Sequence, residues 1–158
     1  MLRVDIRDLQ RGPVRTDGEL QPDDPTFEGL GLELVGPVVV HGQLQATGDD
    51  EYLWRGDLHA TVRGECRRCL TEVLDPIDVT VDAAVFSSDP DAMDDPDFYP
   101  LSDRAGSVDV GAVVREEIAL AAPAHLLLCR EDCAGLCPRC GADLNAGPCA
   151  CHTPAEPV

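Results

Sequence analysis

The chain has little with which to hold a phosphate backbone over its whole surface. It contains no lysine, and 12 arginines stand against 30 aspartates and glutamates, which gives a formal net charge of −18. Nucleic-acid-binding proteins usually carry a basic face, because neutralising phosphates and releasing counterions supplies much of their affinity. With this net charge the molecule as a whole would be repelled by a phosphate backbone, and it should attract basic proteins. The alternative is that the acid serves solubility alone.

Aromatic residues and long apolar runs are also scarce. Aromatics make up 4% of the chain, beside 14 glycines and 13 prolines, so we expect a modest core with generous loops. No run approaches membrane-spanning length, and the first residues, MLRVDIRDLQRG, lack the apolar segment of a signal peptide. We therefore expect a cytoplasmic protein with no membrane contact. In a reducing cytoplasm, clustered cysteines bind metal more often than they form disulfides.

Motifs for catalysis are missing as well. The chain shows no phosphate-binding loop, no Ser/His/Asp set and no deaminase signature. Its paired carboxylates, such as Glu116 and Glu117, are most simply a solvated helix face. We expect a protein that is not an enzyme and has no small-molecule substrate.

Alternating apolar and polar residues predict an α+β fold dominated by strands. Segments 2–9, 31–47, 52–63 and 70–86 together predict four to six strands in an antiparallel meander or open barrel-like sheet. The period of two is clearest at Ile77, Val79 and Val81, and Gly36-Pro37 marks a bend within 31–47. In 52–63 this pattern puts Trp54, Leu58, Ala60 and Val62 on one face, although Gly56 weakens the middle of the strand.

One main helix is expected at about 108–122. Asp109 can cap it, and an apolar stripe runs along it through Val110, Val113, Val114, Ile118 and Ala121. Before the helix, 87–107 is acidic and interrupted by prolines, which predicts a flexible loop. The expected organisation is a β-rich domain over 1–128, a cysteine-rich zinc-binding knuckle region over 129–152 and a disordered tail over 153–158.

The eight cysteines fall into four close pairs, and these are the strongest chemical signal in the chain. The pairs are Cys66 and Cys69, Cys129 and Cys133, Cys137 and Cys140, and Cys149 and Cys151. Zinc favours four thiolates in a tetrahedron, and CxxC turns are a common way to supply them. The spacing predicts two structural Zn²⁺ sites that use all eight thiols.

Several groupings of these pairs are open. We favour a compact site from the last two pairs, which leaves the hairpin pair to meet Cys129 and Cys133, because the shorter loop has the lower closure entropy. Alternatives join CRRC with CPRC, or CREDC with CPRC. His125 and His152 are potential substitute ligands, although a lone histidine is more often a surface or core residue. Disulfides, redox catalysis and a catalytic zinc fit the context less well.

Small basic islands interrupt the acidic sequence. Arg63, Arg67 and Arg68 surround the first cysteine pair and are candidate RNA contacts. Arginines also gather in the first sixteen residues. Such arginines commonly pair with local carboxylates instead.

The segments CRRCL, EEIALAAP and CREDCAGLCPRCGADLNAGPCAC together resemble the YceD family, whose members are described as large ribosomal RNA subunit accumulation proteins. The resemblance spans most of the chain, up to Cys151. It implies a cytoplasmic role in 23S ribosomal RNA accumulation and large-subunit biogenesis. No catalytic residues transfer with it, and the cysteine set transfers by position.

The charge and the resemblance lead to one hypothesis and an alternative. We expect a non-catalytic assembly factor that binds a basic ribosomal or ribosome-assembly protein on a pre-large-subunit particle, with limited rRNA contact at most. The alternative is a zinc protein that binds or processes rRNA directly.

Overall fold

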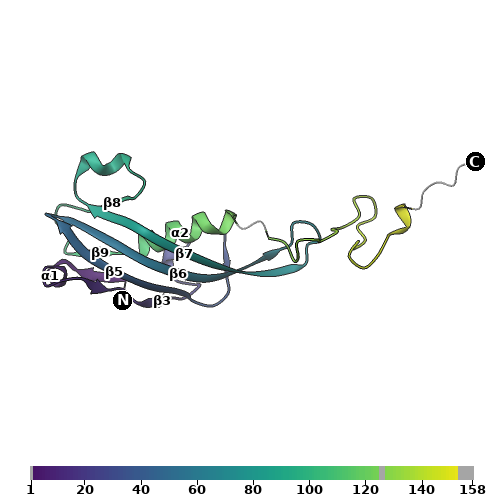
Figure 1. Cartoon of the computed structure of the whole chain (residues 1–158), viewed down its shortest axis with the longest axis horizontal. Helices are drawn as coiled ribbons and strands as arrows, with labels where there is room; N and C mark the ends of the chain where they lie inside the picture. The colour runs from purple at the N-terminus through teal and green to yellow at the C-terminus, as the bar shows by residue number, and fades with distance from the viewer. Residues whose placement is uncertain (1, 125–126, 153–158) are drawn as a thin grey trace, which may run out of the picture.

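The computed structural model describes residues 2–124 and 127–152. The described chain is elongated: long strands form the body, and the cysteine-rich segment extends beyond one end of them (Figure 1). The strands are β1 (Arg3–Asp5), β2 (Val14–Arg15), β3 (Gly18–Leu20), β4 (Glu33–Leu34), β5 (Val38–Gly48), β6 (Glu51–Glu65), β7 (Glu72–Ser87), β8 (Phe98–Pro100) and β9 (Ser107–Asp109). The helices are α1 (Ile6–Leu9) and α2 (Gly111–Ala124), with 3-10 turns η1 (Pro25–Phe27), η2 (Pro90–Asp94) and η3 (Ala150–His152). The predicted tail over 153–158 lies outside the described residues.

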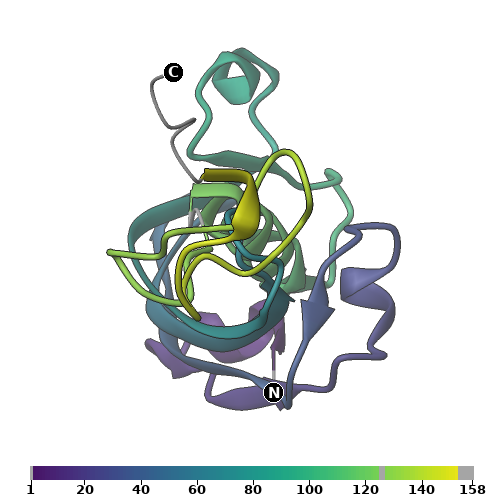
Figure 2. The same ribbon diagram turned by 90° about the vertical axis from the view of Figure 1, so that its right-hand side faces the viewer.

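The main sheet is built on an antiparallel meander of β5, β6 and β7. Strands β2 and β3 pair with the outer side of β5, β4 pairs with β6, and β8 pairs in parallel with the end of β7. Seen from the end, the sheet curves around α2 without closing (Figure 2). The expected class is confirmed: a strand-dominated α+β fold with an open sheet and one main helix.

Trp54, the fourth residue of β6, anchors the core. Its side chain is fully buried, and its indole Nε1 donates a 2.7 Å hydrogen bond to Oγ1 of Thr16, which is also buried. The ring lies against two glycines, since a Cβ added to Gly42 or to Gly56 would stand 2.6 Å from ring atoms. Gly56, which was expected only to weaken the strand, therefore provides the space that the ring occupies. The rest of the predicted face is confirmed, since Leu58, Ala60 and Val62 are buried.

A bulge follows at the same level of the sheet. Trp54 pairs with Ala84 of β7 but Gly56 pairs with Val81, so β7 carries an extra residue between these two pairs. A bulge bends the strand that carries it and increases its twist.

The helix begins later than its sequence pattern indicated. The expected range was 108–122, but Val108 and Asp109 belong to β9, which pairs with β1, and α2 runs over Gly111–Ala124. The Asp109 carboxylate accepts a 2.8 Å hydrogen bond from the Gly111 N–H, so this residue does satisfy a donor of the first turn. The predicted stripe is confirmed, with Val110, Val113, Val114 and Ile118 fully buried and Ala121 partly buried.

The N-terminal prediction is partly wrong. Segment 2–9 was expected to be one strand, but it forms the short β1 and then the single turn of α1. Asp5 causes the change, because its carboxylate accepts a 2.8 Å hydrogen bond from the Arg7 N–H and caps the turn. Strand β1 pairs with β9, which brings the start of the chain against the segment that leads into α2.

The acidic segment 87–107 contains more regular structure than expected. It holds η2 and β8, and β8 is fixed to β7 by bonds such as the 2.8 Å one from the Val85 N–H to the Asp97 carbonyl. Tyr99 also stacks on Phe86, with ring centroids 5.3 Å apart. These contacts explain why a segment that reads as a loop adds a strand. Its flexibility stays a prediction.

No helix in the described part of the chain is both long and apolar enough to cross a bilayer.

The close packing around Trp54 predicts that adding one methyl group at a neighbouring glycine lowers the stability of the protein. Gly42→Ala places a Cβ against the indole and should lower the free energy of unfolding by about 1–3 kcal/mol. Chemical denaturation followed by tryptophan fluorescence measures this. The matched control is Gly48→Ala in the same strand, where the nearest atom would be 3.8 Å away. Equal stability of the two variants would contradict the packing described.

Candidate metal centres

The first CxxC turn forms the tip of the β6–β7 hairpin, as the sequence indicated. The Leu70 N–H bonds to the Cys66 carbonyl and the Cys66 N–H bonds to the Thr71 carbonyl, each at 2.8 Å. These two bonds close the turn so that the thiols of Cys66 and Cys69 lie on the same side. Both cysteines are buried.

The second CxxC turn, at Cys137 and Cys140, has the same backbone bonds. The Gly141 N–H bonds to the Cys137 carbonyl and the Cys137 N–H bonds to the Ala142 carbonyl, again at 2.8 Å each. The residue after the second cysteine has a positive φ in both turns, 63° at Leu70 and 73° at Gly141. Glycine suits this conformation, whereas leucine adopts it at a cost of roughly 1–2 kcal/mol. The chain thus contains two matching knuckles, one of them strained.

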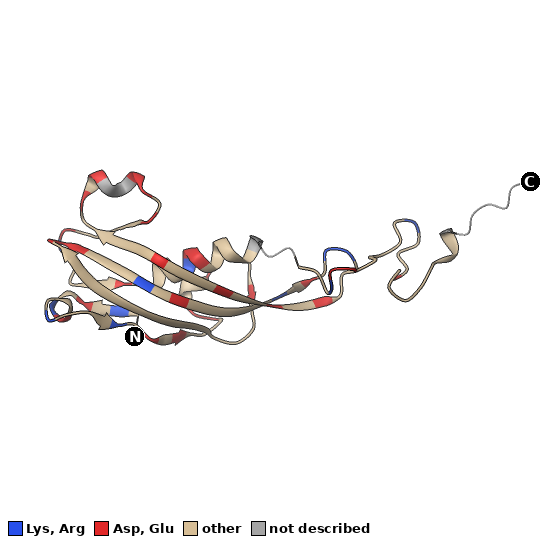
Figure 3. Cartoon of the chain, in the orientation of Figure 1, with Lys and Arg blue, Asp and Glu red and all other residues tan. Residues whose placement is uncertain are grey.

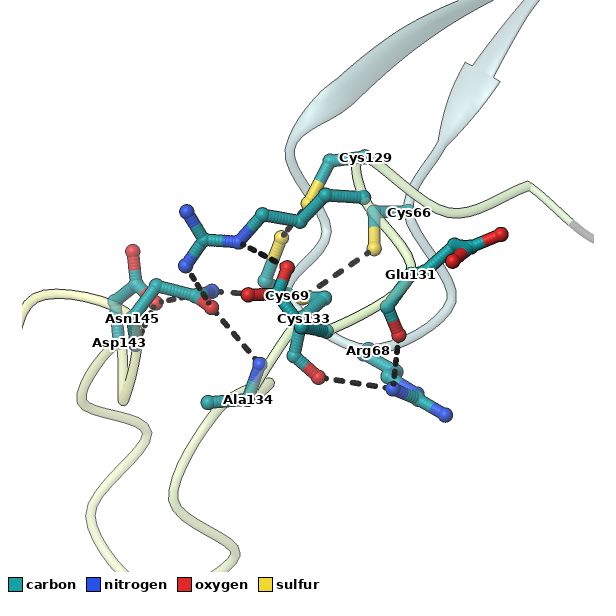
Figure 4. A network of polar contacts seen from close by, with 11 residues as sticks. Cys66, Arg68, Cys69, Cys129, Glu131, Cys133, Ala134, Asp143 and Asn145 are labelled. Carbon is teal, nitrogen blue, oxygen red and sulfur yellow. Dashed lines mark hydrogen bonds and ion pairs between the residues drawn. The ribbon is translucent and has the colours of Figure 1, made fainter.

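The hairpin knuckle meets the segment that follows α2. Cys66, Cys69, Cys129 and Cys133 place their Sγ atoms within 4.8 Å of one another. The Sγ atoms of Cys66 and Cys133 are 3.8 Å apart, and those of Cys69 and Cys129 are 3.5 Å apart (Figure 4). We call these four residues the hairpin set.

The other four cysteines form a second group, which we call the distal set. Cys137, Cys140, Cys149 and Cys151 also place their Sγ atoms within 4.8 Å of one another. The loop between its two pairs is held by a bridge between Leu136 and Asp143 and by a 2.9 Å bond from the Leu144 N–H to the Gly135 carbonyl.

The structure thus forms the grouping that loop length favoured. The two alternatives, which joined CPRC with CRRC or with CREDC, are not the groups that form among the described cysteines. Two histidines were considered as substitute ligands. His125 and the side chain of His152 both lie outside the described residues.

The sulfur spacing suits a shared metal ion better than disulfides. A disulfide needs about 2.05 Å between sulfurs. Four sulfurs at about 2.3 Å from one tetrahedral ion lie about 3.8 Å apart. The 3.5 and 3.8 Å separations in the hairpin set match the second arrangement, and all eight cysteines are free thiols.

Thiol acidity in the hairpin set also favours a cation. The backbone N–H of Cys129, with further help from the N–H groups of Cys69 and Arg68, lowers the pKa of Cys66 to about 6. By contrast, the hydrogen bond with the Cys69 thiol and burial raise the pKa of Cys129 to about 12. Four crowded thiols cannot all ionise unless a cation balances them.

The distal set shows the same contrast. The backbone N–H groups of Cys140 and Arg139 lower the pKa of Cys137 to about 6, while the hydrogen bond with Cys140 raises the pKa of Cys151 to about 12. Each set can therefore hold one metal ion, which would make all four thiolates favourable at once.

Sequence reasoning missed Asn145, which joins the two sets. It lies in the loop of the distal set, yet its amide Nδ2 donates to Sγ of Cys133 at 3.4 Å and to Oδ1 of Asp143 at 2.9 Å. Its Oδ1 accepts hydrogen bonds from Arg130 at 2.6 Å and from the Ala134 N–H at 2.8 Å (Figure 4). An N–H group aimed at a ligating sulfur stabilises the thiolate and orients it. The sequence feature that could have indicated this role is the position of Asn145, after Leu144, inside the cysteine motif.

The three candidate RNA-contacting arginines differ in what their side chains do. Arg63 forms ion pairs with Glu33 at 2.9 Å and with Glu72 at 3.6 Å. Arg68 donates to the carbonyls of Glu131 and Cys133, so it holds the hairpin tip to the cysteine segment. Among the described residues, the exposed Arg67 is the one of the three whose guanidinium has no protein acceptor.

Residues 54–157, which include both cysteine sets, match the family described as "Large ribosomal RNA subunit accumulation protein YceD". The chain belongs to the YceD family. A YceD role in accumulation of the large ribosomal subunit is implied by this membership.

Mycobacterial proteins are similar to this YceD chain over nearly its whole length. An uncharacterised protein of Mycobacterium leprae is 29% identical, with 97% of this chain and 72% of the relative aligned. Uncharacterised proteins of Mycobacterium bovis and Mycobacterium tuberculosis are each 32% identical, with 99% of this chain and 77% of the relative aligned. No solved structure matches the chain significantly.

Asn145 predicts a measurable effect on metal retention. Asn145→Asp keeps an acceptor for Arg130 but turns the donor that faces Cys133 into a second carboxylate oxygen, which repels a thiolate. We expect a chelator to remove the ion of the hairpin set about 10–100-fold more readily than in the parent. Chelator competition followed by absorbance measures this. Asp103→Asn, which changes an exposed carboxylate outside both cysteine sets, is the control, and unchanged retention in Asn145→Asp would contradict the role assigned.

Proposed function

We propose that this protein is a non-catalytic factor in large-subunit assembly that supports 23S rRNA accumulation by binding a basic ribosomal or ribosome-assembly protein in the cytoplasm. Family membership supports the assembly role. The choice of a protein partner rests on one observation: most of the arginines are already bonded within the molecule. Five pair with carboxylates and two donate to backbone carbonyls: Arg3, Arg7, Arg11, Arg63 and Arg130, then Arg68 and Arg115.

The acidic residues outnumber these arginines across the body of the molecule. Carboxylates lie along β6 and β7, on α2 and around η2 (Figure 3). A surface of this sign repels phosphates and steers basic proteins toward it. Charge complementarity therefore supports a basic protein, on the pre-large-subunit particle, as the direct partner.

The metal sites serve structure in this proposal, and zinc is the ion that suits them. Four thiolates fill the tetrahedral positions of zinc and leave none open for substrate or water. Catalytic zinc instead keeps one position open and usually recruits histidine or carboxylate. Two closed zinc sites would hold the cysteine-rich segment on the hairpin tip, with no small-molecule substrate and no membrane involved.

Direct rRNA binding is the second candidate, and one residue favours it. Arg67 is exposed at the hairpin tip, and no acceptor among the described residues uses its guanidinium. A contact of this kind would give a small RNA footprint beside the protein partner.

Metal analysis tests the structural part of the proposal. Elemental analysis of the native protein should find about two zinc ions per chain, and Cys140→Ser should leave about one, because it breaks only the distal set. Native mass spectrometry of both proteins provides the count. A parent value near one ion would rule out two independent sites.

Affinity purification from native cells, with and without RNase, tests the partner. We expect one basic ribosomal or assembly protein to remain bound after RNase treatment, together with cosedimentation of the chain with pre-large-subunit particles. Arg67→Ala should leave this protein contact intact. Tight binding of the purified chain to naked rRNA at physiological salt, with a steep salt dependence that Arg67→Ala reduces by about one unit of slope, would favour the second candidate instead.

A further inference from the structure

Strand β7 has a long open edge. It pairs with β6 over its whole length, but on its other side only Val85–Ser87 have a partner, the short parallel strand β8. Within residues 2–124 and 127–152, no strand pairs with that side of β7 from 72 to 84. An open edge presents unpaired N–H and C=O groups, which can template another strand.

The register shows which backbone groups face outward from this edge. The Thr61 carbonyl of β6 accepts from the Val35 N–H, so the backbone of Thr61 points away from β7. Pro76, opposite Thr61, therefore occupies a non-hydrogen-bonded position, where its missing N–H costs no ladder bond. Because alternate residues repeat this orientation, the N–H and C=O groups of Asp78 and Thr80 also face outward.

The usable part of the edge is bounded at both ends. Before residue 77, Pro76 lacks the N–H that would face outward from the edge. After residue 81, the bulge between Val81 and Ala84 bends the strand. Both features blunt an edge against indiscriminate pairing. Between them, 77–81 is regular strand with outward groups at two residues, enough to seat a short segment rather than a second sheet.

Negative charge near the open edge of β7 favours a basic partner. Asp82 is exposed on the outer face of β7. On the helix side, burial and the nearby carboxylates of Glu116 and Glu117 raise the pKa of Tyr99 in β8. Burial, together with the carboxylates of Glu116 and Asp97, raises the pKa of Glu117. These helix carboxylates lie near β8 and the end of β7, whereas Asp78 is exposed on the edge itself and Asp82 follows it. The edge and its surroundings are therefore acidic, which complements a basic segment.

The helix also offers an apolar contact. Leu120 is 64% exposed, and it lies one turn beyond Glu116 and Glu117 on the same helix face. Because α2 runs back toward the hairpin tip, Leu120 lies on the side of Glu116 that is nearer the tip (Figure 1). Side chains of an added strand alternate between faces, so one set would lie on the Asp82 side of the sheet and the other on the side of α2, where Leu120 is exposed.

We propose that the open edge of β7 at 77–81 binds an extended segment of a basic protein, whose backbone continues the sheet beside β7 and whose alternate side chains are basic and apolar. This deepens the proposed function by naming where the partner docks and in what conformation, and it rests on that function for the identity of the partner. Main-chain bonds would supply affinity, and the flanking carboxylates would supply selectivity.

Amide hydrogen exchange tests the proposal without any substitution. In the free protein, the amides of Asp78 and Thr80 should exchange faster than those of Val79 and Val81, which face β6. The probe is a short capped peptide of alternating lysine and valine, and the control peptide carries glutamate in place of lysine. We expect the lysine peptide to slow Asp78 and Thr80 by about tenfold and the glutamate peptide to leave them unchanged. Binding without slowing at these two amides, or slowing by oligouridine instead of the peptide, would overturn the proposal.

A matched pair of variants isolates the outward donor. Thr80→Pro removes the outward N–H without removing a ladder bond to β6, whereas Thr80→Val keeps the N–H and removes the hydroxyl that bonds to Asp57. Peptide affinity, measured by fluorescence anisotropy, should fall about tenfold in Thr80→Pro relative to Thr80→Val. Thermal unfolding of both verifies that they are folded, and the exchange measurement on the parent decides the matter if Thr80→Pro is not.

The same variants separate this proposal from the broader function. If Thr80→Pro and Thr80→Val cosediment equally with pre-large-subunit particles, the docking edge is wrong and the assembly role stands. If the parent does not cosediment at all, yet the lysine peptide slows Asp78 and Thr80, the assembly role is wrong and the docking edge stands.

Discussion

The contact between the hairpin tip and the segment after α2 organises the rest of this molecule. The Arg67 N–H bonds to the Leu127 carbonyl, the Leu136 N–H bonds to the Arg68 carbonyl, and four thiols from the two sides meet. This contact fixes where the chain goes once α2 has packed beneath the sheet. Without it, the segment 127–152 would have almost no apolar core of its own, because the buried side chains there are mainly cysteines. A metal ion bound at this contact would contribute directly to folding.

Charge and metal chemistry divide the molecule into two parts with different tasks. The sheet and helix carry most of the carboxylates, and four of the arginines there form ion pairs. The cysteine end consists mainly of turns and cysteine pairs, and two of its arginines hold it together: Arg68 bonds to backbone carbonyls and Arg130 bonds to Asn145. Under the proposed function, the acidic body would repel rRNA phosphates and attract the basic proteins that bind rRNA.

The sequence was most informative where local chemistry determines structure. The spacing of the cysteine pairs predicted two sets, and the 3.6-residue period predicted the buried stripe of α2. It was less informative where a distant partner decides the outcome. Nothing local shows that β8 will pair with the end of β7, or that Asn145 will reach across to Cys133. At the N-terminus, alternation resembled a strand, but a single hydrogen bond from Arg7 to Asp5 was enough to start a helical turn.

The length of the β6–β7 hairpin has a thermodynamic consequence. Fifteen residues of β6 extend over roughly 50 Å at about 3.3 Å per residue, and the distal cysteine set lies beyond the tip (Figure 1). Groups so far apart, with no shared neighbours, usually contribute independently to a free energy. The effects of substitutions at the β8 end of the sheet and at the distal set on a binding free energy should therefore be additive. The two ends of the long hairpin can therefore be changed independently of each other.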